Sequence, residues 1–190
     1  MKLLSLRCPR CRGDLEGDNN SQVFFCRNCA IGIDLSRHRE REFSLACVSP
    51  AISQHDPLIY FAFWVFQCHY HWLAAGTGER GENSRDFWVP AFFIKNISYF
   101  GDIGLYYSNR DLKPRSERCR NLPVFPSDRG EADASVYPLI YAVSREAAYR
   151  KSVVDHTILS TRLVWVPFYN AGKEYTDSLL GWAYPSGALI

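Results

Sequence analysis

Two short cysteine pairs near the N-terminus, Cys8–Cys11 (CPRC) and Cys26–Cys29 (CRNC), decide how the first part of this chain folds. Fourteen residues, positions 12 to 25, separate the two pairs. Each Cys-x-x-Cys loop can direct both of its sulfur atoms toward one point. Four thiolates around one point match the tetrahedral coordination that Zn²⁺ prefers in structural sites. The sequence therefore predicts a four-cysteine metal site at Cys8, Cys11, Cys26 and Cys29.

The residues around the pairs agree with this prediction. Gly13 and Gly32 lie just beyond the two loops, where we expect backbone with positive φ. Val23–Phe25 has the composition of a short strand that leads into the second pair. This stretch resembles the zinc-ribbon, or rubredoxin-like, family over residues 3–36. The resemblance implies a small metal-stabilised ribbon, with structural zinc as the expected ion and iron, which rubredoxins hold in the same ligand set, as the alternative.

A disulfide arrangement is the main alternative reading of these cysteines. The chain has seven cysteines, an odd number, and Met1–Leu6 is too short for a signal peptide before the first pair. We therefore expect a reducing compartment, the cytoplasm, in which thiols are rarely oxidised to disulfides. The remaining cysteines lack a flanking motif, so we expect small buried hydrophobic residues at Cys47, Cys68 and Cys119.

Composition and charge narrow the class of protein. Of 190 residues, 47% are hydrophobic and 15% are aromatic, which argues against disorder. Residues 1–48 carry the whole net charge of +2 and residues 49–190 are neutral, whereas a dedicated nucleic-acid binder has a clear basic excess. The longest apolar run, Leu58–Phe66, has nine residues, too few for a membrane span.

The pattern along the chain predicts an α+β protein in two parts. We expect a zinc ribbon over residues 1–36, a linker over residues 37–56 that is marked by charge and proline, and an α+β domain over residues 57–190. The second domain should hold a mainly antiparallel, aromatic-rich sheet with one or two helices.

Several segments of this domain have recognisable periodicity. Leu58–Trp72 is predicted as a long strand, apolar on both faces up to Phe66 and on one face beyond it. Glycine-rich residues 76–81 then mark a turn. The other predicted elements are a strand at 87–94, a helical segment over 132–159, and a C-terminal hairpin formed by 163–169 and 174–180.

The strands predicted at 87–94 and 163–169 contain nearly the same sequence motif, WVPAF and WVPF. The motif predicts an internal repeat, with coincidence in an aromatic-rich chain as the alternative. Proline removes a hydrogen-bond donor from the ladder, so Pro90 and Pro167 should lie at edges or bulges. Exposed edges of this kind would suit an interface. The residues predicted to bind a partner are Trp88, Pro90, Trp165 and Pro167.

Other candidate sites are weaker. The glycines at 76, 78 and 81 match a dinucleotide fingerprint, but residues 82–86 lead into a strand instead of the helix that this mechanism requires. His69 and His71 share a strand face, yet two ligands do not make a metal site, so we expect surface or hydrogen-bonded histidines. Asp155–His156 is not a triad without a placed nucleophile. We therefore assign no catalytic residue.

These observations favour a non-catalytic accessory or assembly subunit that binds other proteins, because a four-thiolate site leaves no open position for a substrate. A nucleic-acid-associated ribbon protein in transcription or processing is the alternative, and an iron protein in electron transfer is the second. The loop from Arg110 to Arg120 is basic, and phosphate attracts such charge. Four further arginines surround the cysteine pairs, namely Arg7, Arg10, Arg12 and Arg27.

Overall fold

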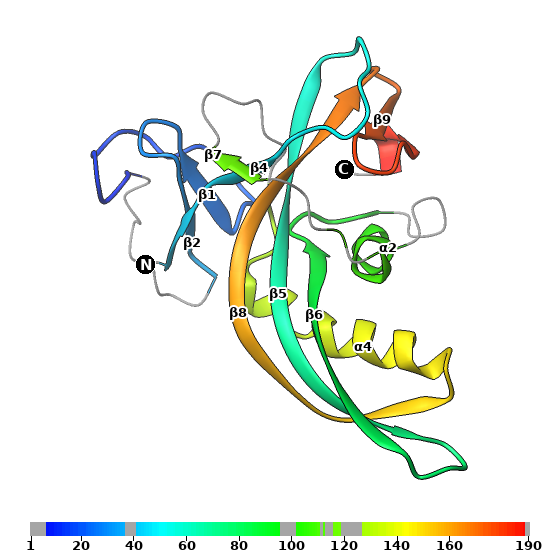
Figure 1. The fold of residues 1–190 in the computed structure, drawn as a ribbon. Coiled ribbons are helices and arrows are strands. Elements are labelled where there is room, and N and C mark those ends of the chain that lie inside the picture. Colours follow the sequence, from blue (N-terminus) through cyan, green and yellow to red (C-terminus); the bar gives the residue numbers. More distant parts are fainter. Residues whose placement is uncertain are drawn as a thin grey trace.

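Three long strands dominate the computed structural model, and they curve side by side (Figure 1). They are β5 (Leu58–Ala74), β6 (Arg80–Pro90) and β8 (Lys151–Asn170). β5 lies in the middle and pairs antiparallel with both neighbours, which confirms the predicted, mainly antiparallel sheet. The structure describes residues 7–36, 41–95, 102–110, 112, 116–118 and 127–188.

Shorter elements surround these strands. The remaining strands are β1 (Val23–Cys26), β2 (Ile31–Asp34), β3 (Arg41–Ser44), β4 (Ala46–Val48), β7 (Ser116–Arg118), β9 (Glu174–Asp177) and β10 (Ala183–Pro185). The helices are α2 (Ile103–Asn109), α3 (Glu131–Ala134) and α4 (Tyr137–Ala147), followed near the C-terminus by the 3-10 turn η1 (Ser186–Ala188). None of the described helices combines the length and the apolar character that crossing a bilayer needs.

The shorter strands fall into two groups. β1, β2 and β3 form a separate antiparallel sheet, called here the N-terminal sheet. β9 pairs alongside the last residues of β8 and β10 pairs with β9, so both widen the main sheet at that end. β4 runs parallel to β8 and pairs on its other side with β7. β3 and β4 both fall in the segment predicted as a linker, and the division of the chain into domains stays a prediction.

The burial of β5 follows its sequence. Residues 60–66 are all buried, because both faces of this half of the strand are covered. Beyond them the burial alternates, with Gln67 and His71 exposed and Tyr70 and Trp72 buried. This change from two covered faces to one is the pattern that the apolar periodicity predicts.

The N-terminal sheet shares a hydrophobic core with the main sheet. Val23 of β1 and Phe43 of β3 belong to the same cluster as Trp64 of β5 and Trp165 of β8. The Phe43 and Trp64 rings meet edge to face, with centroids 4.9 Å apart. Tyr141 of α4 packs on the same cluster, whereas α2 covers the other face of the sheet.

The first half of β8 corrects the predicted helical segment. Helix α4 lies within the predicted range 132–159, but residues 151–159 form strand instead of helix. This stretch is rich in β-branched residues, including Val153, Thr157 and Ile158, which favour strands. Pairing with β5 along its whole length then stabilises residues 151–159 as strand.

Strand β6 also differs from its prediction. It begins at Arg80, seven residues before the predicted start at Phe87, and it ends at Pro90 instead of residue 94. The polar stretch 80–86 lacks an apolar pattern, but it pairs residue by residue with the half of β5 that has one solvent-exposed face. The predicted C-terminal hairpin is confirmed, with Gly172 at φ 83° in its turn.

The four residues predicted to bind a partner are buried, so their expected exposure is wrong. Trp88 and Trp165 are each 1% exposed, because the main sheet uses both indoles as core. Pro90 is the last residue of β6. Pro167 lies where β8 changes its outer neighbour from β4 to β9, a position that tolerates a missing donor. Their role in binding, and the internal repeat, stay predictions.

Candidate metal centre

Two backbone loops bring the cysteine pairs together. Cys26 is the last residue of β1, and the pairing of Cys26 with Ile31 closes the tight turn that contains Cys29. In the first loop, the Cys8 N–H donates to the Gly13 carbonyl (2.8 Å). A bridge between Glu16 and Phe25 joins the two loops through a pair of backbone hydrogen bonds of 2.8 and 3.0 Å.

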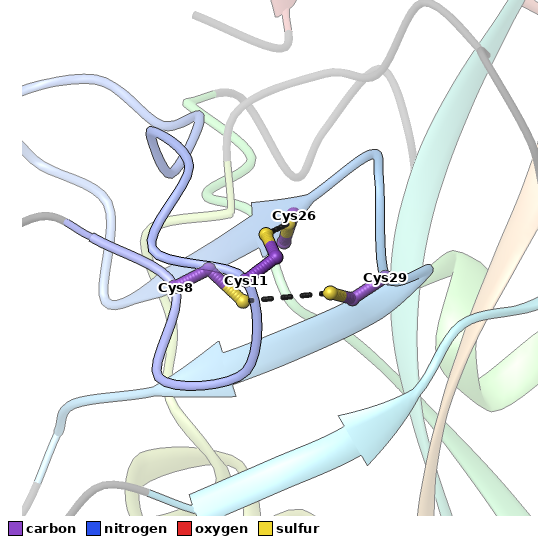
Figure 2. Close-up of side chains that lie close together, drawn as sticks. All are labelled: Cys8, Cys11, Cys26 and Cys29. Carbon is purple, nitrogen blue, oxygen red and sulfur yellow. Dashed lines mark hydrogen bonds between the residues drawn. The ribbon is translucent and has the colours of Figure 1, made fainter.

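The four sulfur atoms gather at one point between the loops (Figure 2). The Sγ atoms of Cys8 and Cys29 are 3.8 Å apart, and those of Cys11 and Cys26 are 3.5 Å apart. All four lie within 4.8 Å of one another. At a Zn–S distance of about 2.3 Å, two sulfurs on a tetrahedral ion lie roughly 3.8 Å apart. The four cysteines thus cluster within metal-binding distance.

The predicted role of the two glycines is wrong. The positive φ values fall instead on Arg12 (60°) and Ala30 (51°), which follow the second cysteine of each loop. A Cβ on Gly13 would lie 3.3 Å from the Cys11 sulfur. A Cβ on Gly32 would lie 3.3 Å from Leu163 Cδ2 and 3.4 Å from the Trp165 ring. Both glycines therefore serve close approach, not backbone conformation.

The local hydrogen bonds give the thiols different acidities. The pKa of Cys11 is lowered to about 7, chiefly by the backbone hydrogen bond from Gly13. The pKa of Cys29 is raised to about 12, chiefly because its thiol hydrogen-bonds to Cys11. Burial raises the pKa of Cys26. Without a cation, one ionised thiolate therefore makes ionisation of the other thiols less favourable, whereas a metal ion would stabilise all four thiolates.

Zinc should determine which cysteines are alkylated. In the zinc-loaded chain at pH 7.5, the four clustered cysteines should react slowly with iodoacetamide, because a metal-bound thiolate is protected. Removal of the zinc with a chelator should make all four react quickly, whereas buried Cys68, whose pKa is raised to about 12, should still react last among the described free cysteines. Peptide mass spectrometry over a time course measures the order. Equal rates for the four cysteines with and without zinc would contradict the prediction.

The remaining cysteines lie away from this cluster. Cys68 is buried and reduced, as expected. Cys47 is buried as well, as expected. It is disulfide-bonded, however, so the expectation of a free cysteine at this position is wrong. No sequence motif marks that pairing, because disulfides depend on spatial proximity. Cys119 lies outside the described residues.

Two of the four arginines near the cysteines are occupied in ion pairs. Arg10 pairs with Glu42 at 2.7 Å, and Arg27 pairs with Glu16 at 2.5 Å. These carboxylates offset the positive field that would attract a phosphate backbone. Most of the basic loop from 110 to 120 lies outside the described residues.

The structure also places the other sequence candidates. Gly76 and Gly78 adopt positive φ in the turn between β5 and β6, which confirms their interpretation as turn residues. The Asp155 carboxylate accepts a hydrogen bond from the backbone N–H of His156. His69 and His71 face Glu82 of β6, a carboxylate that the sequence interpretation missed. The hairpin turn between β5 and β6 could have identified Glu82 from the sequence, because the register of the turn determines which β6 residue lies opposite His71.

Comparison with known proteins adds no relative. The chain matches none of the protein-family models, and neither the curated proteins nor the solved structures contain a significant match. Function is therefore inferred from the geometry of the chain itself.

Proposed function

We propose that the N-terminal segment is a zinc ribbon in which Cys8, Cys11, Cys26 and Cys29 bind one structural Zn²⁺. The single observation that supports this most is the spacing of the four sulfur atoms, which matches tetrahedral thiolate coordination. The wider fold supports a structural role. The sheet that carries Cys26 packs on the main sheet, so the ion stabilises part of the shared core.

We further propose that the chain is a non-catalytic accessory subunit that binds another protein. Helix α4 exposes an aliphatic row formed by Val136, just before its first residue, Ile140 and Val143, with 58%, 54% and 46% exposure. These residues are spaced by four and three positions, so they lie on one side of the helix. Uncharged aliphatic side chains suit a protein surface better than a phosphate backbone.

Native purification of the chain with its bound partners tests both parts. Mass spectrometry should identify a stable protein complex, and elemental analysis should find at least one zinc per chain. Recovery with nucleic acid, lost steeply as salt rises, would favour the alternative ribbon function instead. Iron with a visible thiolate absorption band would favour electron transfer.

A charge in the aliphatic row should remove the partner. Ile140→Asp places a carboxylate at the centre of the proposed interface, and we expect the co-purifying protein to fall at least about tenfold. Leu159→Asp is the matched control, because Leu159 is 56% exposed but lies on β8. The zinc content of both variants should equal that of the parent. Equal partner recovery from Ile140→Asp and parent would reject α4 as the docking surface.

A further inference from the structure

Two histidines and a carboxylate converge on the exposed face of the β5–β6 hairpin. His69 and His71 are two residues apart on β5, so both side chains lie on the same face. Glu82 of β6 is the direct cross-strand partner of His71. One ligand atom from each of the three residues lies within 4.8 Å of the other two.

The spacing of the ligand atoms leaves room for an ion. Glu82 Oε2 is 3.5 Å from His69 Nε2 and 3.9 Å from His71 Nδ1. Both distances exceed the usual range of a hydrogen bond, about 2.7–3.2 Å. Two ligand atoms at about 2.0–2.1 Å from a tetrahedral ion are roughly 3.3–3.4 Å apart. The two distances to Glu82 Oε2 are therefore within about half an ångström of the spacing that a tetrahedral ion requires.

A further hydrogen bond orients the first histidine. His69 Nδ1 is 3.0 Å from the Ser84 hydroxyl, so its other nitrogen, Nε2, is the one that faces Glu82. Metal-binding histidines commonly engage their second nitrogen in this way, which fixes the ring and its tautomer. The two imidazole rings are nearly perpendicular, at 86°, so they are not simply stacked on each other.

The charged residues that line the groove beside these histidines are net negative. An open groove of about 500 Å³ runs past His71 and Glu82, and Asp155 and Arg80 also line it. Asp155 is the cross-strand partner of His71 on β8, so His71 lies between two acidic positions. Two carboxylates against one guanidinium favour a bound cation over an anion.

We propose that His69, His71 and Glu82 form a second metal site, which binds a divalent transition-metal ion such as Zn²⁺. Two imidazoles and one carboxylate are a ligand set that suits zinc and its first-row neighbours. The three side chains are 31%, 46% and 67% exposed, so the protein supplies only part of the coordination shell. Unlike the four-cysteine cluster, this site leaves positions open for water or another small ligand.

Calorimetric titration with ZnCl₂ tests the proposal on the full chain, after one equivalent of zinc has filled the cysteine cluster. We expect one further equivalent to bind. His71→Ala and Glu82→Gln should each weaken this second event at least about tenfold, and Ser84→Ala should weaken it by about tenfold through loss of orientation. His55→Ala, in an exposed loop, is the control and should bind as the parent does.

Cobalt reports which site is filled. Co²⁺ added to the zinc-loaded chain should give weak visible bands without thiolate-to-cobalt charge transfer, and His71→Ala should remove them. Thermal melts of the variants should match the parent, because the substituted side chains are substantially exposed. The proposal is overturned if binding stops at one equivalent, if His71→Ala and Glu82→Gln bind like the parent, or if the cobalt spectrum shows thiolate charge transfer alone.

Discussion

Cys26→Ser should abolish zinc binding by the cysteine cluster and unfold the N-terminal sheet. Cys26 is 1% exposed, and its sulfur is 3.5 Å from that of Cys11, so a hydroxyl there removes a buried ligand. Structural zinc contributes on the order of 10 kcal/mol of folding free energy in small zinc-finger peptides, and a segment of this size cannot replace that with apolar burial. In a His71→Ala background, which leaves the cysteine cluster as the proposed zinc site, elemental analysis should show less than about a tenth of the zinc found in His71→Ala alone.

Hydrogen exchange should then show where structure is lost. Amides of β1 and β2 should lose protection, whereas those at the centres of β5 and β8 should keep it, because these strands pair with each other along their whole length. The intrinsic tryptophan emission should shift to the red, since loss of the N-terminal sheet uncovers Trp64 and Trp165.

Cys68→Ala provides the control for this result. Cys68 is also buried and free, but it lies on β5 in the main sheet, outside the four-cysteine cluster. The variant should lose some stability through a small cavity, about 1 kcal/mol, and keep the zinc content of the parent. Stoichiometric zinc in Cys26→Ser in the His71→Ala background, or loss of zinc in Cys68→Ala, would contradict the four-cysteine assignment.

The four-cysteine cluster and strand β5 could be predicted because the sequence patterns that identify them are local. A Cys-x-x-Cys pair can form a metal-binding loop within four residues, so spacing alone identifies the ligands to be tested. The apolar pattern of β5 likewise records which of its faces are covered, residue by residue, and the change after Phe66 appears in both sequence and burial.

The parts that were missed depend on partners distant in sequence. Residues 151–159 contain β-branched residues that favour strand, but their pairing with β5, some 85 residues earlier in the chain, is not encoded locally. Glu82 joins the histidines only once the hairpin register is fixed. The burial of Trp88 and Trp165 follows from neighbours on both faces, so their aromatic character alone could not separate core from interface.

Trp64→Ala should strongly lower the free energy of unfolding, because Trp64 lies at the contact between the N-terminal sheet and the main sheet. Trp64 is fully buried in β5, its ring meets Phe43 of the N-terminal sheet, and its Nε1–H donates to the Arg129 carbonyl at 2.9 Å. Truncation leaves a cavity and an unpaired carbonyl, so the free energy of unfolding should fall by about 3–5 kcal/mol. Urea titration of the zinc-loaded chain, followed by circular dichroism, measures this loss.

Trp182→Ala is the matched control for that measurement. Trp182 is half-buried, and its ring contacts Tyr106 with centroids 4.6 Å apart, so the same truncation removes less packing. We expect a loss of about 0.5–1.5 kcal/mol. Because Trp64 bridges the two sheets, its variant should also lose protection from exchange in β1 and β2, whereas the Trp182 variant should not. Equal losses from both variants would mean that the two sheets are held together by contacts other than Trp64.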